Sequence, residues 1–84
     1  MSENLVEKRE HARHRVLKGG RLAFDDGGGV DCMVRNLSST GARLDGVSPI
    51  GLPESFTLVI EIDHFRRRCH PVWSHNKRIG VAFD

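Results

Sequence analysis

The apolar residues of this sequence occur in short segments, mostly at every second position, and no segment repeats them at the 3.6-residue spacing of a helix. A period of two places apolar side chains on one face of a β-strand. Six such segments follow one another, separated by turn-forming residues: 21–24, 30–37, 42–45, 56–62, 67–74 and 78–83. The pattern therefore predicts an all-β fold.

The chain has 84 residues, enough for one hydrophobic core but not for a second. Six short strands joined by turn-rich loops are typical of an antiparallel barrel or sandwich. Because closing the sheet removes its exposed edges, we predict a six-stranded antiparallel β-barrel over residues 15–84. Residues 1–14 are mostly polar and charged, and we expect them to form a flexible basic arm.

The alternation also predicts which side chains lie inside the barrel. The inward positions are expected to be Phe24, Val30, Cys32, Val34, Phe56, Leu58, Ile60, Ile62, Cys69, Pro71, Trp73, Ile79, Val81 and Phe83. The glycine-rich segment 25–29 is expected to form the turn of a hairpin. Pro71 cannot donate a backbone hydrogen bond, so it predicts an edge strand or a bulge.

The composition argues against several classes of protein. No apolar stretch reaches the 18 residues or so that a membrane helix needs, and the net charge is only +2. The first residues lack the apolar segment of a signal peptide, so we expect a cytoplasmic protein in which Cys32 and Cys69 stay buried, unpaired thiols.

The histidines follow no zinc-binding spacing, and we predict neither a metal nor another cofactor. Cys69 and His70 are neighbours on a strand and point to opposite faces, and no catalytic motif is present, which indicates a protein that is not an enzyme.

Two short motifs are candidates for ligand binding. The first is an RxxxR element in residues 8–13, and the second is an NxSxxG element in residues 36–41. The candidate ligand-binding residues are Lys8, Arg9, Arg13, Asn36, Ser38 and Gly41. In this order and at this spacing the two motifs resemble those of the PilZ domain family, and the resemblance extends through Trp73 and segment 78–83. It implies a six-stranded barrel that acts as a small stand-alone bacterial receptor for the second messenger cyclic di-GMP.

The chemistry of these residues agrees with what the resemblance implies. The guanidinium groups of Arg9 and Arg13 can each form two parallel hydrogen bonds to a phosphate or to the O6/N7 edge of a guanine. Asn36 and Ser38 are two residues apart, so on a strand their side chains would share one face. Gly41 would allow a positive φ or a close approach of the ligand. A serine turn closing a hairpin is the simpler interpretation of the second motif.

Several questions stay open at this level. Many PilZ domains carry a further arginine where this chain has Lys8, which leaves the number of ligands per site undetermined. A barrel that has lost nucleotide binding and acts only through protein contacts is the first alternative. A small barrel that binds nucleic acid is a weaker one, because Phe65 is the only aromatic side chain predicted to be available for stacking on bases. If the ligand does bind, we expect it to alter the surface that an unidentified downstream protein recognises.

Overall fold

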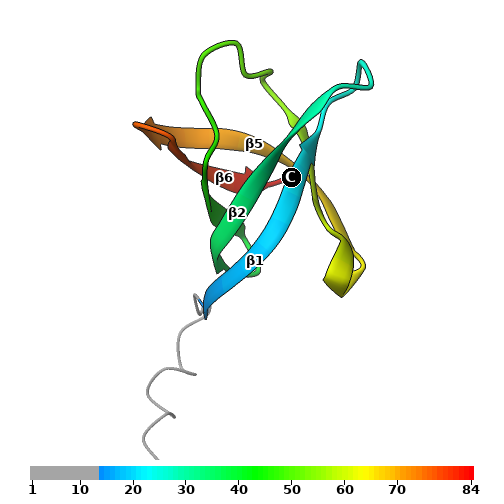
Figure 1. Ribbon diagram of the computed structural model, residues 1–84, viewed down its shortest axis with the longest axis vertical. Helices are drawn as coiled ribbons and strands as arrows, with labels where there is room; N and C mark the ends of the chain where they lie inside the picture. The colour runs from blue at the N-terminus through cyan, green and yellow to red at the C-terminus, as the bar shows by residue number, and fades with distance from the viewer. Residues whose placement is uncertain (1–13) are drawn as a thin grey trace, which may run out of the picture.

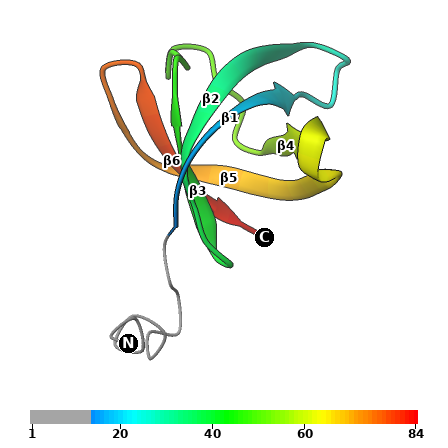
Figure 2. The same ribbon diagram turned by 60° about the horizontal axis from the view of Figure 1, so that its bottom comes forward.

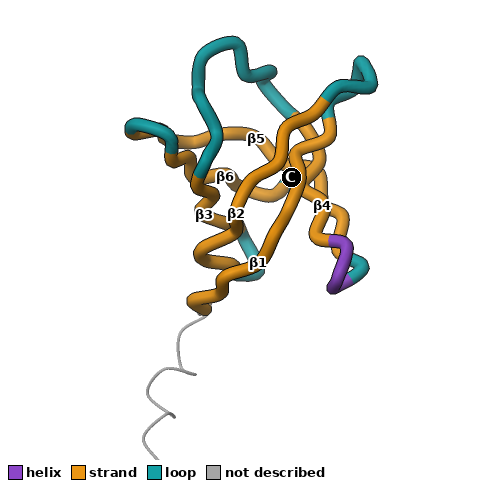
Figure 3. Tube along the Cα trace, in the orientation of Figure 1, coloured by secondary structure: helices purple, strands orange, loops and turns teal. Residues whose placement is uncertain are grey.

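The computed structural model describes residues 14–84, which fold into six strands and one short 3₁₀ helix (Figure 1; Figure 3). The elements are β1 (His14–Ala23), β2 (Gly29–Leu37), β3 (Gly41–Asp45), β4 (Phe56–Ile60), η1 (Glu61–Asp63), β5 (Phe65–His75) and β6 (Arg78–Phe83). The predicted arm lies outside the described residues, except for His14, which begins β1.

The strands close into a barrel in the order β1-β2-β3-β6-β5-β4, and every neighbouring pair is antiparallel. The prediction of a six-stranded antiparallel barrel is therefore confirmed. β6 returns between β3 and β5, as the turned view shows (Figure 2). This brings the middle of the chain and its last strand together on one side of the barrel.

The core consists of apolar side chains that point into the barrel from all six strands, together with one residue of the β3–β4 connection. It contains Leu22, Cys32, Val34, Leu44, Val47, Phe56, Leu58, Ile60, Cys69, Ile79 and Val81. Most of the predicted inward positions are among them, and Phe24 and Phe83 pack against this cluster while staying partly exposed. Both cysteines are buried and free, as expected from the sequence.

The hairpin between β1 and β2 forms where the glycine-rich segment predicted it. Gly27 has φ 95°, a conformation that favours glycine, and the carboxylate of Asp26 accepts a hydrogen bond of 2.8 Å from the Gly28 amide. Gly29, the first residue of β2, follows this loop. A Cβ built on Gly29 would stand 2.5 Å from the carbonyl oxygen of Leu22, so any larger residue would be crowded.

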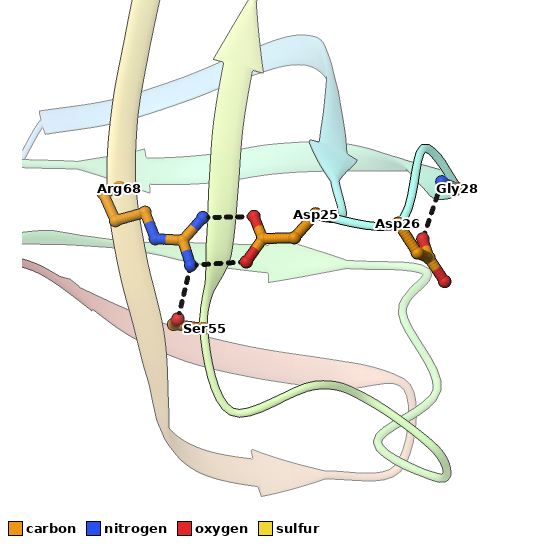
Figure 4. A network of polar contacts seen from close by, with 5 residues as sticks. All are labelled: Asp25, Asp26, Gly28, Ser55 and Arg68. Atoms are coloured by element: carbon orange, nitrogen blue, oxygen red, sulfur yellow. Dashed lines mark hydrogen bonds and ion pairs between the residues drawn. The ribbon is translucent and has the colours of Figure 1, made fainter.

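An ion pair fixes this hairpin loop to β5, which is separated from β1 by β4 (Figure 4). Arg68 on β5 donates two hydrogen bonds, of 2.7 and 2.9 Å, to the carboxylate of Asp25 and a third, of 2.8 Å, to Ser55 Oγ. The two-pronged contact joins the β1–β2 loop, the end of the β3–β4 connection and β5. The guanidinium group also lowers the pKa of Asp25 below its ordinary value.

Three of the predicted inward positions are wrong. Val30 is 38% exposed at the start of β2. Ile62 is 79% exposed because β4 ends at Ile60 and the chain turns away from the sheet in η1. Trp73 is 46% exposed because the register of β5 against β6 shifts between Pro71 and Trp73. One extra residue in a strand moves the next side chain to the opposite face.

The same shift confirms the bulge that Pro71 predicts, and it reverses the assignment of the aromatic residues. Phe65 is only partly exposed, packs against the core and lies with its ring centroid 5.6 Å from that of Phe83. The exposed aromatic side chain of the barrel wall is therefore that of Trp73, and the prediction that Phe65 is the available aromatic surface is wrong.

Candidate functional site

A cleft of about 460 Å³ lies on the outer surface of the barrel, across the ends of β2 and β3 and the adjoining parts of β6 and β5. The polar and aromatic residues that line it are Asn36, Ser38, Thr40, Arg43, Trp73, His75 and Arg78. Its floor is made of small residues of β3 and β6, which include Gly41, Ala42, Gly80 and Ala82. A cleft with a flat backbone floor and long side chains at its sides suits a planar, charged ligand.

One row of residues crosses all four strands and forms the middle of the cleft. Asn36 on β2 is paired with Arg43 on β3, Arg43 with Gly80 on β6, and Gly80 with Trp73 on β5. Directly paired residues of neighbouring strands point to the same face of a sheet. Arg43 and Trp73 therefore stand on the two sides of a glycine, on the outside of the barrel.

The indole of Trp73 lies directly over Gly80. A Cβ built on Gly80 would overlap Nε1 and Cε2 of the indole and would lie 2.7 Å from Cδ1. The indole can therefore lie in this place only if residue 80 is a glycine, and no positive φ is involved. With one face of the ring on the strand and 46% of the residue exposed, the indole offers a surface on which a flat ligand can stack.

Ser38 and Gly41 of the second motif form the turn between β2 and β3. Ser38 Oγ accepts hydrogen bonds of 3.2 Å from the Thr40 and Gly41 amides, and the Ser38 amide donates to the Gly41 carbonyl at 2.9 Å. The simpler interpretation, a serine turn, is therefore realised, and the same residues also line the cleft. The expectation that Asn36 and Ser38 share a strand face is wrong, because β2 ends at Leu37.

Gly41 is needed for a close approach of backbone to backbone. A Cβ on this residue would overlap the carbonyl oxygen of Val81 on β6. Gly41 has no positive φ, so of the two reasons predicted for a glycine here only the close approach applies. The group that comes close to Gly41 is the backbone of β6. Whether a ligand also approaches Gly41 stays a prediction.

The charged groups of the cleft are mainly positive. Arg43 and Arg78 line it together with His75. The carboxylate of Asp45 lies beside them: it is opposite Arg78 in the β3–β6 register, and its side chain contacts Arg35 Nη1 at 3.1 Å and Arg43 Nε at 3.6 Å. Two cations share one carboxylate there, so the surface beside the cleft stays positive and favours an anionic ligand.

The first motif falls outside the described residues, so the structure places none of Lys8, Arg9 and Arg13. The described chain begins beside the second motif, because His14 on β1 is paired with Leu37 and Arg15 with Asn36. The start of β1 is therefore next to one end of the cleft.

Residues 7–84 match the family model of the PilZ domain. The chain belongs to the PilZ family. A search of curated proteins gives no match. Membership in this family implies, in general terms, a binding domain that acts as a receptor for cyclic di-GMP.

Several cleft residues of this PilZ domain were not identified from the sequence, among them Arg43, Trp73 and Arg78. Arg43 could have been found, because it precedes the inward Leu44 and so faces outward. Arg78 could have been found in the same way from the buried Ile79. Trp73 could not, because alternation alone places it inside and only the bulge turns it out.

Three further properties of the described residues concern metal binding, membrane insertion and the reactivity of the cysteines. Among residues 14–84, no group of three or more histidine, cysteine, aspartate or glutamate side chains is placed to bind a metal ion. The same part of the chain has no helix long and apolar enough to cross a bilayer. Both cysteines are poor nucleophiles, because burial raises the pKa of Cys32 and of Cys69 to about 11 each.

Proposed function

We propose that this PilZ domain binds cyclic di-GMP in the cleft formed by β2, β3, β5 and β6, with Arg9 and Arg13 completing the site, and that the altered surface is recognised by a protein partner. One observation carries the proposal. The second motif, Asn36 to Gly41, lines the same cleft as two arginines and an exposed indole. The cleft needs no metal or resident cofactor for this role.

The cleft chemistry matches the two parts of the ligand. The ligand has two phosphates and two guanines, and arginine forms two-pronged hydrogen bonds both to phosphate and to the O6/N7 edge of guanine. Arg43 and Arg78 supply such groups from adjacent strands. Any base can stack on an aromatic ring, and Trp73 presents one beside them.

The first motif can reach this cleft through the chain itself. Arg13 directly precedes His14, and Arg9 lies five residues before it. An extended chain spans at most about 3.6 Å per residue, so the Cα atom of Arg9 lies within about 18 Å of that of His14. Since β1 starts beside the second motif, both arginines are within range of a ligand in the cleft.

Binding would place a dianionic ligand, held also by Arg9 and Arg13, on this surface, and it would replace positive by negative charge there. We propose that a cytoplasmic protein partner distinguishes these two surfaces. A pull-down from a bacterial lysate with and without cyclic di-GMP that recovers the same proteins in both cases would contradict this part of the proposal.

Isothermal titration of cyclic di-GMP into the wild-type protein and into Arg9→Ala and Arg13→Ala tests the main proposal. Each hydrogen bond to a charged group contributes about 1.5–3 kcal/mol, so we expect either variant to bind about 10- to 150-fold more weakly than the wild type. Thermal melts check that both variants are folded. The titration also gives the number of ligands per site, which Lys8 leaves open.

Arg66→Ala is the matched control, because Arg66 is an exposed arginine of β5 that does not line the cleft. We expect it to bind like the wild type. No heat and no melting shift for the wild-type protein would overturn the proposal and would favour a barrel that acts only through protein contacts. Salt-dependent binding of random single-stranded oligonucleotides, tighter than that of cyclic di-GMP, would favour the nucleic-acid alternative instead.

A further inference from the structure

Asp45 lies between two arginines on the outside of the barrel, next to the cleft. Arg35 Nη1 donates to Asp45 Oδ2 at 3.1 Å, and Arg43 Nε lies 3.6 Å from Asp45 Oδ1. Arg43 and Asp45 are two residues apart on β3, so both point to the outer face. Arg35 is the extra residue at the shift in register between β2 and β3.

The contact between Arg43 and Asp45 is incomplete. At 3.6 Å the two atoms are farther apart than the 2.7–3.2 Å or so of an N–H···O hydrogen bond. Arg43 Nε and Asp45 Oδ1 are both buried, and neither has a hydrogen-bond partner among the described residues. Buried polar groups without partners are rare and call for an explanation. Here the two unsatisfied atoms face each other, so a small movement of the Arg43 side chain would satisfy both.

The orientation of Arg43 follows from which of its atoms faces Asp45. A guanidinium group has five N–H donors, one on Nε and four on Nη1 and Nη2. With Nε directed at Asp45, the other donors are left for the cleft that Arg43 lines. An acceptor in the cleft that binds the terminal nitrogens can shift the guanidinium group. The same shift can bring Nε within hydrogen-bond distance of Asp45 Oδ1.

We infer that Asp45 is a positioning residue, which holds Arg43 by Nε so that the two terminal nitrogens face an anionic or guanine-like acceptor in the cleft, and that Arg35 holds Asp45 in turn. This inference rests on the proposed function. It says how Arg43, one of the proposed ligand contacts, is oriented, and it explains why a carboxylate stands beside a site for an anion. Binding and the Arg43–Asp45 contact then strengthen each other.

Removing the Asp45 charge distinguishes positioning from simple electrostatics. If the carboxylate acted only through its charge, Asp45→Asn would leave the cleft more positive and would bind cyclic di-GMP more tightly. If it positions Arg43, the amide loses an acceptor for one of its two arginines, and binding weakens. We expect about a tenfold weaker affinity, the effect of losing one charge-assisted hydrogen bond.

The experiment is a double-variant cycle measured by titration with cyclic di-GMP. It compares the wild type, Asp45→Asn, Arg43→Ala and the double variant. We expect Asp45→Asn to cost about tenfold in the wild-type background and almost nothing when Arg43 is absent, because its effect passes through Arg43. Equal losses in both backgrounds, or unchanged or tighter binding by Asp45→Asn, would overturn the inference.

Two further variants keep the result interpretable. Asp31→Asn is the matched control, because it removes the same charge from an ion pair, with Arg21 at 3.3 Å, that lies away from the cleft. If Asp45→Asn melts too low to titrate, Asp45→Glu keeps the charge and misplaces the carboxylate by one methylene. It too should bind more weakly, and binding as in the wild type would overturn the inference. A wild-type protein that binds no cyclic di-GMP would overturn the proposed function itself, whereas wild-type binding with no effect at Asp45 would overturn only this inference.

Discussion

Replacing Gly80 by alanine tests whether the indole of Trp73 is part of the ligand site. The added Cβ would overlap two atoms of the indole, so the ring has to leave its place over β6. The ring is half exposed and is the far end of a side chain, so it can swing outward without opening the barrel. The change should therefore move one side chain and leave the fold in place.

The size of the effect on stability and on binding can be estimated separately. Alanine is favoured over glycine in a strand by about 0.5–1 kcal/mol, while a displaced rotamer of Trp73 costs about 0.5–1.5 kcal/mol. These terms nearly cancel, and the free energy of unfolding should stay within about 1 kcal/mol of the wild-type value. Loss of a stacked base costs about 1–3 kcal/mol, which predicts a 5- to 150-fold or so weaker affinity for cyclic di-GMP.

Tryptophan fluorescence and titration together provide the assay, because Trp73 is the only tryptophan of the chain. In Gly80→Ala the emission should shift to longer wavelength, since the ring becomes more exposed to water, and ligand should quench it less. Gly19→Ala is the control: Gly19 lies in β1, and a Cβ there would meet no atom within 4 Å. Wild-type emission in Gly80→Ala would refute the geometry, and shifted emission with wild-type affinity would refute the stacking.

Two predictions concern the stability of the barrel. Arg68→Met should lower the melting temperature by a few degrees at low salt and less at high salt, because the Asp25 pair is exposed. Since Arg68 lowers the pKa of Asp25, the difference between the two proteins should begin to shrink as the pH falls below the ordinary value of 3.8 and should vanish once the pH is below the lowered pKa of the folded protein. Burial raises the pKa of Cys32 and Cys69 above 9, so the unfolded chain loses these protons first and urea melts should show stability falling between pH 9 and about 11. Cys32→Ala should show a smaller fall over that range, and an equal fall would contradict the assignment.

The fold could be predicted from the sequence because alternation holds over most of each strand. Phe56, Leu58 and Ile60 are buried at every second position of β4, as a strand with one inward face requires. The prediction fails where the chain leaves that regularity: Ile62 follows the end of β4, and Trp73 follows an extra residue in β5. Both departures depend on pairing with other strands, which a single segment of sequence does not contain.

The candidate site was predictable only in part, for a related reason. Asn36, Ser38 and Gly41 could be found because they are close in the sequence and form a motif. Arg43 and Trp73 are 30 positions apart, and only the order of β3, β6 and β5 brings them to the two sides of Gly80. Residues that meet through register across several strands leave no pattern of spacing along the chain.

The two bulges next to the cleft explain how a regular barrel comes to carry it. One lies in β2 at Arg35 and the other in β5 at Val72, so they stand on opposite sides of the cleft. Between them β3 and β6 pair without a shift in register and supply the flat floor. Each bulge sets the face on which the next residue, Asn36 or Trp73, emerges, and bulges of this kind commonly aim side chains at functional sites. Deleting Val72 would remove the extra residue and leave Pro71 opposite Val81 and Trp73 opposite Gly80 in continuous register, so the indole should stay on the outer face.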